Sequence, residues 1–277
     1  MPIENIHQLM AWIPPRQDPI IEAGILLPET RCFIFGAAKT WKSMLSQYTA
    51  FTIAVGNDWL GYKTQPTTVL KYQAELPKAI DRDRIIKFAR ASDLYPDNLF
   101  FNTPEDRIKL DTSWGIQALQ RDVETVMNRC PDTRLVLILD PVYRLVAGHI
   151  SDEYDVKKFQ DNIDDLKNKL KFSIILIHHS RLAKTDSSGN IVDMGAEEAM
   201  GSSYWNNWCD TMIRTKILNP FTTKDKVEIN FFLTRNSQRI VPDIEVQWSR
   251  LDLHPTITNT HKMEAEDISV QNLVGSK

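Results

Sequence analysis

The stretch FIFGAAKTWKSMLSQ, residues 33–47, decides the fold of this chain. An apolar run of strand length ends at Gly36, and beyond the turn apolar side chains recur at helical spacing from Met44 to Val55. A strand, a glycine turn and a helix in this order gather backbone N–H groups at the positive end of the helix, where they can bind phosphate. The spacing matches a phosphate-binding loop, except that Trp41 replaces its second glycine.

This loop predicts a nucleotide-binding site. We expect Lys42 to reach the outer phosphates and Ser43 to place its hydroxyl on Mg²⁺. Trp41 fits only if the backbone there accepts a residue with a Cβ and the ring points away from the phosphates. A fortuitous match and a degenerate, slowly hydrolysing site both remain open as alternatives. The residues expected to contact the nucleotide are Gly36, Ala37, Ala38, Lys39, Thr40, Trp41, Lys42 and Ser43.

Composition indicates an ordinary globular protein that acts inside the cell. The 277 residues are 42% hydrophobic and 25% charged, and the net charge of −3 gives no overall basic field for nucleic acid. The start, MPIENIHQLMAW, lacks the pattern of a secretion signal, and the apolar runs are too short to span a bilayer. Three widely separated cysteines without metal-ligand spacing favour buried thiols in a reducing cytoplasm.

Apolar strands alternate with amphipathic helices along most of the chain, which predicts an α/β fold with a mostly parallel sheet flanked by helices. After residue 200 only strands are expected, which favours an antiparallel extension at the sheet's edge. We expect an arm at 1–30, one domain at 31–255 and a polar tail at 256–277. The expected strands are 31–35, 69–73, 99–102, 135–139, 173–177, 209–215, 227–233 and 244–248, and the expected helices are 6–12, 43–55, 114–127 and 153–170.

Two carboxylates are candidates for the chemistry. Asp140 closes the apolar run in RLVLILDPVYR, a pattern typical of the acid that holds magnesium, although buried strands often end in aspartate. Pro141 follows it, so the water-activating acid must come from elsewhere. Glu75, just beyond the strand ending at Gln73, could orient the attacking water. A solvated loop glutamate is the alternative interpretation.

Polar residues also follow the later strands. His178 and His179 end the run SIILIHH, where one could bond a γ-phosphate and the other pack at the strand end; no third ligand supports zinc. Polar loops at 144–154 and 180–203 follow Asp140 and the histidines. Arg214 and Arg235 end late strands, and either could neutralise phosphoryl charge across a subunit boundary, or lie on the surface.

The order of these motifs resembles the RecA-like ATPases, and most of all the plasmid RepA-type hexameric helicases and their phage and mobile-element relatives. The resemblance spans about residues 20–250, and HHSRLAK with MGSSYWNNWCDTMIR is its most particular part. It implies ATP and Mg²⁺ as cofactors, with Lys42, Glu75, His178 or His179, and Arg214 or Arg235 as catalytic groups and Ser43 and Asp140 at the metal. It also implies a hexameric ring whose two polar loops touch single-stranded DNA.

Three functions are compatible with these motifs. The first is an ATP-driven helicase or translocase in the replication of a mobile element. The second is a filament or loader that uses ATP as a switch, with slow hydrolysis owing to Trp41. The third is a small-molecule kinase, which lacks an arginine-rich lid in this sequence. Stimulation of ATP turnover by single-stranded DNA separates the first function from the third, and strand displacement separates it from the second.

Overall fold

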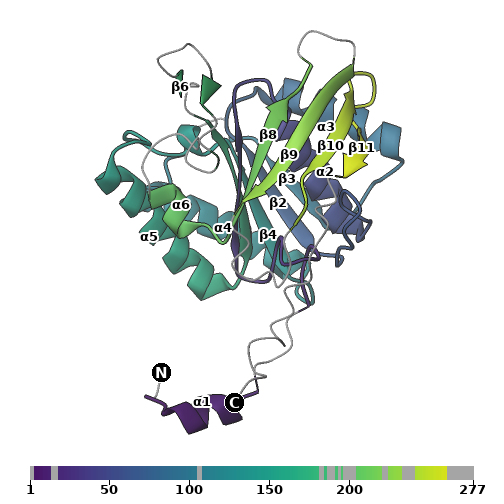
Figure 1. Cartoon of the computed structure of the whole chain (residues 1–277). Coiled ribbons are helices and arrows are strands. Elements are labelled where there is room, and N and C mark those ends of the chain that lie inside the picture. Colours follow the sequence, from purple (N-terminus) through teal and green to yellow (C-terminus); the bar gives the residue numbers. More distant parts are fainter. Residues whose placement is uncertain are drawn as a thin grey trace, which may run out of the picture.

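The computed structural model describes residues 3–13, 18–104, 108–180, 184–185, 191–192, 195, 204–219, 224–232 and 241–260. Figure 1 shows a central sheet with helices on both of its faces. In chain order the elements are α1 (Ile6–Ala11), β1 (Arg31–Gly36), α2 (Lys42–Val55), β2 (Thr68–Gln73), α3 (Lys78–Ser92), β3 (Leu99–Asn102), α4 (Ser113–Arg129), β4 (Leu135–Asp140), the 3-10 helix η1 (Val142–Arg144), α5 (Glu153–Leu170), β5 (Ser173–His179), β6 (Lys184–Thr185), β7 (Ile191–Val192), α6 (Tyr204–Trp208), β8 (Thr211–Ile217), β9 (Lys224–Phe232), β10 (Ile244–Ser249) and β11 (Pro255–Thr260).

The main sheet has nine strands in the order β11-β10-β9-β8-β1-β5-β4-β2-β3. Every pairing from β8 through β1, β5, β4 and β2 to β3 is parallel. The pairings β8–β9, β9–β10 and β10–β11 are antiparallel. The predicted fold class is therefore confirmed. One detail differs, because β8 pairs in parallel with β1 and so lies inside the sheet, with the antiparallel extension beginning at β9.

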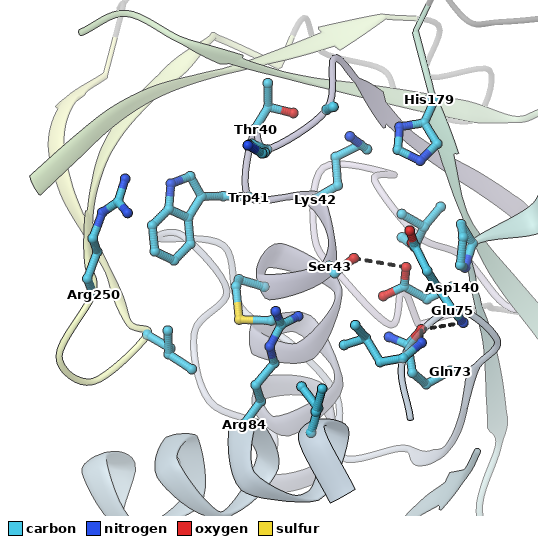
Figure 2. A pocket seen from close by; sticks show the side chains of 18 of the residues that line it. Thr40, Trp41, Lys42, Ser43, Gln73, Glu75, Arg84, Asp140, His179 and Arg250 are labelled. Carbon is cyan, nitrogen blue, oxygen red and sulfur yellow. Dashed lines mark hydrogen bonds between the residues drawn. The ribbon is translucent and has the colours of Figure 1, made fainter. Parts of the chain in front are cut away.

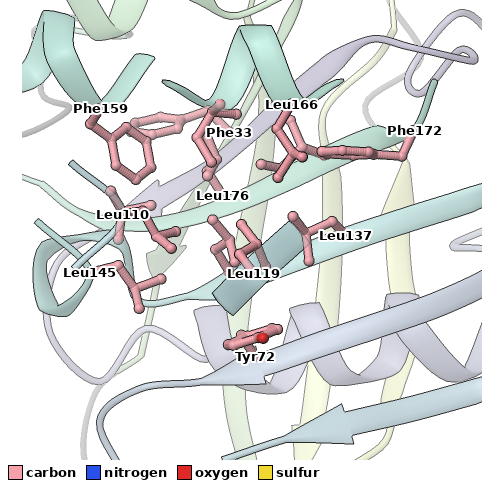
Figure 3. Close-up of a cluster of buried hydrophobic side chains, with 14 of the residues drawn as sticks. Phe33, Tyr72, Leu110, Leu119, Leu137, Leu145, Phe159, Leu166, Phe172 and Leu176 are labelled. Atoms are coloured by element: carbon pink, nitrogen blue, oxygen red, sulfur yellow. The ribbon is translucent and has the colours of Figure 1, made fainter. Parts of the chain in front are cut away.

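Alternation along the strands divides the core into two layers. Phe33 and Leu137 point toward α4, α5 and α6, where Figure 3 shows them packed with Leu119, Phe159 and side chains around them. Their strand neighbours, such as Ile34 and Ile138, point to the opposite face and pack with residues of α2. A residue's parity within its strand therefore decides which face it joins, and this rule places the site residues below.

The structure adds six elements that the sequence analysis did not predict: α3, η1, β6, β7, α6 and β11. The short helix α6 corrects the expectation that only strands follow residue 200. Helix α3 follows Glu75 and buries only Asp81, Phe88 and Ala89 of its fifteen residues. Strand β11 occupies residues 256–260 of the expected tail, while residues 261–277 lie outside the described part. Helix α3 packs on α2 through Phe88 and Phe51, and His254, in the turn before β11, packs on Tyr48 of the same helix.

The expected arm divides into two parts. Helix α1, capped by the Asn5 side chain, buries none of its residues and stands apart from the domain (Figure 1). Ile20, Ile21, Ile25 and Leu26, in contrast, are buried in the layer under α2. Among the described helices, none combines the length and apolarity needed to cross a membrane.

Candidate functional site

The loop between β1 and α2 has the geometry of a phosphate-binding turn. Gly36 ends β1 where a Cβ would lie 2.4 Å from the backbone oxygen of Thr215 on β8, so only glycine fits without movement. Thr40 Oγ1 bonds the Ala37 oxygen at 2.9 Å and the Thr215 hydroxyl at 2.8 Å. No side chain caps the N-terminus of α2, so its first N–H groups are available to an anion.

Trp41 lies in this loop with its ring turned away from Lys42 (Figure 2). Its backbone is left-handed, with φ 67°, the conformation that the usual glycine favours. The indole Nε1–H donates to Asp225 at 2.8 Å, and the ring stacks on Trp248 with centroids 5.2 Å apart and planes 9° from parallel. Arg250 bonds the same Asp225 oxygen at 2.7 Å. The ring of Trp41 thus points away from the expected phosphate position, as the sequence analysis requires, because Asp225 of β9 and Trp248 of β10 hold it there.

Lys42 projects from the first turn of α2 toward the loop and toward His179 (Figure 2). Its Nζ donates to the Ala37 oxygen at 2.5 Å. Burial lowers the pKa of Lys42 to about 8, and the charges of Asp140 and Glu75 oppose that shift. The ammonium therefore sits poorly solvated beside two carboxylates, and an incoming phosphate would add a third negative group next to it.

Asp140 ends β4 and is 1% exposed. Ser43 Oγ donates to its Oδ1 and Ser46 Oγ to its Oδ2, both at 3.0 Å, and Lys71 Nζ lies 3.4 Å from Oδ2. A serine hydroxyl at the helix start and a carboxylate are the oxygen donors with which proteins hold Mg²⁺ on a nucleotide. The described residues contain no cluster of three or more His, Cys, Asp or Glu that would hold a metal in the absence of a nucleotide. The donor set therefore fits nucleotide-bound magnesium.

Glu75 lies close to Asp140, in the turn between β2 and α3 (Figure 2). Its side chain is exposed and accepts a hydrogen bond from the Tyr143 hydroxyl at 3.1 Å. Its backbone N–H donates to the Gln73 side chain at 2.9 Å, which fixes the turn (Figure 2). The negative charge of Glu75 acts on both Lys42 and His179, so the three groups are neighbours.

The two histidines have different surroundings because they alternate along β5. His179 shares parity with Ile177, lines the cavity and packs against the Tyr143 ring at 5.3 Å. Burial, and then the Lys42 charge, lower the pKa of His179. His178 is fully buried on the other face, against the rings of Phe33 and Trp205. The sequence left the two open, and the geometry assigns the cavity to His179.

These groups open into one cavity of about 870 Å³. The phosphate loop, Glu75, Asp140 and His179 line one end. The other end is lined by the apolar side chains of Trp41, Met44, Ile80 and Leu253 together with the charged Asp83, Arg84, Lys87 and Arg250. Arg84 projects from α3 (Figure 2). The Arg84 guanidinium makes no hydrogen bond or ion pair with another described residue. Sequence reasoning missed this end, because α3, β9 and the β10–β11 turn supply it from distant parts of the chain.

Arg214 is not at the cavity. It lies buried in β8, where its Nε donates to Asn230 at 2.9 Å and its guanidinium covers the Phe232 ring at 5.1 Å. These contacts lie within one chain, so the expected role of Arg214 at a neighbour's phosphates stays a prediction. Arg235 lies outside the described residues.

The first of the two polar loops, 144–154, continues from η1 beside Tyr143. Arg144 covers the Tyr143 ring at 5.2 Å, and the exposed His149 anchors the loop through its N–H to Asp155 at 2.9 Å. Most of 180–203 lies outside the described residues, but β6 and β7 pair there as a short antiparallel ladder. The one loop described in full thus begins next to the site.

Comparison with known families adds a sequence finding to this geometry. A model of the AAA domain family matches residues 4–184, more than half of the chain. The chain belongs to the AAA domain family. This AAA domain contains, within the matched residues, the phosphate loop, Glu75, Asp140 and His179. No curated protein matches the sequence.

Solved structures show the same fold for this AAA domain. One solved ATPase domain is similar with a TM-score of 0.62 at 10% identity, covering 83% of this chain and 85% of that one. A DnaB-like replicative helicase, solved with its interactions with primase, has a TM-score of 0.62 at 10% identity. The match covers 82% of this chain and 58% of the helicase chain, so this chain spans little more than half of that relative. The protein therefore has the RecA-like P-loop fold of helicase-type ATPases.

Proposed function

We propose that this AAA domain protein hydrolyses ATP and uses the energy to move along or unwind single-stranded DNA, as a ring of identical subunits, in the replication of a mobile element. The observation that carries the proposal is the convergence of Lys42, Ser43 with Asp140, Glu75 and His179 at one end of a single cavity. Each is a type of group that can bind or hydrolyse a nucleotide, and four different elements or turns bring them together.

The two ends of the cavity suit the two ends of ATP. The amides at the start of α2 and the Lys42 ammonium would bind the phosphates. The base would lie at the apolar end, where the Arg84 guanidinium offers a planar cation to an aromatic ring. Arg84→Ala should then weaken the binding of Mg·ADP without weakening that of Mg·pyrophosphate, because pyrophosphate has no base. Equal loss for both ligands would place the base elsewhere.

Hydrolysis would use the groups at the phosphate end. Magnesium, held by Ser43 and Asp140, would neutralise charge on the phosphates. Glu75 is exposed to the cavity and free to accept a proton from water, while its hydrogen bond from Tyr143 fixes the carboxylate's direction. His179, with its pKa lowered, would be neutral at neutral pH and could donate one hydrogen bond to the γ-phosphate.

The proposed ring and the proposed binding of DNA are supported by other observations than ATP hydrolysis is. One solved relative is an ATPase domain of the same fold, and the other is a replicative helicase by name. The loop 144–154 starts at Arg144, the last residue of η1 and four residues after Asp140, so a change at the nucleotide has a short path to it. We propose this loop and 180–203 as the DNA contacts. We also propose that an arginine of a neighbouring subunit, Arg214 or Arg235, completes each site, and that the protein acts in the cytoplasm.

The test is ATP turnover with and without a single-stranded oligonucleotide, using duplex DNA and the Lys42→Ala variant as controls. We expect turnover that depends on Lys42 and rises with the single strand, together with displacement of an annealed strand. Turnover and ATP-dependent DNA binding without strand displacement would instead support a filament or loader. An ATP turnover rate that is the same with and without DNA would contradict the proposal that the protein acts on DNA.

A further inference from the structure

One buried charge beside the site has no place in the mechanism above. Lys71 lies in the middle of β2, is 1% exposed, and shares parity with Val69 rather than with Leu70 and Tyr72. Its side chain therefore points to the α2 face of the sheet, the face of the phosphate loop. There its Nζ lies 3.4 Å from Oδ2 of Asp140, a carboxylate that is also 1% exposed.

Lys71 completes the partners of that carboxylate. Ser43 bonds Oδ1, and Ser46 and Lys71 share Oδ2. Asp140 is thus neutralised and fixed by this chain's own groups before any metal is present. A carboxylate that only served magnesium would not need a buried ammonium, which is itself costly to remove from water.

We propose that Lys71 is a positioning residue for magnesium: an internal cation that holds Asp140 in its binding geometry when the metal is absent and weakens magnesium binding when it is present. The proposal rests on the proposed nucleotide site. The ammonium stabilises the empty site because an unpaired buried carboxylate is strongly unfavourable. The same ammonium repels a divalent cation bound nearby, at short range and away from screening by salt. The metal should then leave readily with the product nucleotide.

The ion pair is tested by a double-mutant cycle on the nucleotide-free protein in EDTA. Lys71→Met leaves a bare carboxylate, and Asp140→Asn leaves a bare ammonium; each should lower the Tm by about 10 °C. The double variant has no buried charge, and its asparagine offers an oxygen to one serine hydroxyl and an amide N–H to the other, which can accept it. It should therefore lose clearly less than the two single losses combined. Lys171→Met, which breaks the exposed pair with Glu29, is the control and should shift the Tm by about 2 °C or less. Additive losses in the cycle would overturn the proposal.

The effect on the metal is measured by thermal stabilisation with ADP at increasing Mg²⁺. The Mg²⁺ concentration for half-maximal stabilisation should be about tenfold lower for Lys71→Met than for the wild type. An unchanged or higher concentration would refute the metal-weakening role. If the wild type shows no stabilisation by Mg·ADP at all, the nucleotide site itself fails, while the cycle in EDTA still reports whether the ion pair holds Asp140. If Lys71→Met does not fold, the double variant and Asp140→Asn still give the sign of the coupling.

Discussion

Replacing Trp41 with glycine restores the usual phosphate-loop pattern, yet the structure predicts that the protein becomes less stable. The change removes a hydrogen bond from the indole to the Asp225 carboxylate, worth about 1.5 kcal/mol, and an aromatic pair with Trp248, worth about 1 kcal/mol. It also exposes the apolar surface that the half-buried ring covers, about 2 kcal/mol. Glycine relieves the left-handed backbone at φ 67°, which returns about 1.5 kcal/mol.

The net expectation for Trp41→Gly is a loss of about 3 kcal/mol in the free energy of unfolding, or about 8 °C in Tm for a chain of this size. Trp41→Phe is the matched control, because it keeps the ring stack and the strained backbone and loses only the hydrogen bond; it should lose about 1.5 kcal/mol. Urea denaturation followed by circular dichroism measures both without relying on tryptophan emission.

The same variants report on the nucleotide. Because the indole points away from Lys42, Trp41→Gly should bind Mg·ADP no more weakly than the wild type under conditions where both are folded. A Trp41→Gly protein as stable as the wild type would refute the packing argument. A large gain in ADP affinity would show instead that the indole obstructs the phosphates.

Three other changes test the remaining parts of the site. Glu75→Gln should lower ATP turnover by a factor of about 100 or more while leaving Mg·ADP binding intact, since it removes the proton acceptor and no phosphate contact; equal turnover would remove Glu75 from the mechanism. Mg·ADP affinity should fall above pH 8, by up to about tenfold per pH unit, because Lys42 with its pKa near 8 loses its charge there; Lys42→Arg should lose this dependence. Between pH 8 and the ordinary lysine pKa of 10.5, Lys42 binds more protons in the unfolded chain than in the folded one. The contribution of Lys42 to the free energy of unfolding should therefore rise with pH across this range. Gly36→Ala should cost about 2 kcal/mol or more in unfolding free energy, because its Cβ would press on the Thr215 oxygen, whereas Ala38→Gly in the same loop should change little.

Much of this fold can be predicted from the sequence, because apolar runs indicate buried strands directly. The runs at 135–139 and 173–177 predict two strands of a parallel sheet, and the structure extends each only to its polar end residues. That the two strands are neighbours is known only from the structure. Helix α3 was missed for the opposite reason: it buries little, so hydrophobic periodicity is weak there. The parallel pairing of β8 with β1 was also missed. Between β5 and β8 the described residues contain no helix longer than the five residues of α6, so no long helix marks a crossover there.

The candidate site divides in the same way. Lys42, Ser43, Glu75 and Asp140 follow strand ends or open a helix, so their meeting at one sheet edge is predictable from local sequence. The place of Lys71 is not predictable in this way, because a lysine in a strand is ordinarily expected to face solvent. Only its position in β2 within the folded sheet shows that it is buried beside Asp140. The surroundings of Trp41 depend on Asp225 and Trp248, nearly two hundred residues away, which no local pattern connects to the loop.

The claim on which the account depends is that the turn from Gly36 to Ser43 binds a nucleotide through Lys42 and magnesium. Calorimetric titration with Mg·ADP, for the wild type and Lys42→Ala, tests it most directly. The account predicts saturable binding to the wild type that needs Mg²⁺ and is lost in Lys42→Ala while that variant remains folded. Absence of binding to the wild type, or equal binding to both proteins, would contradict it.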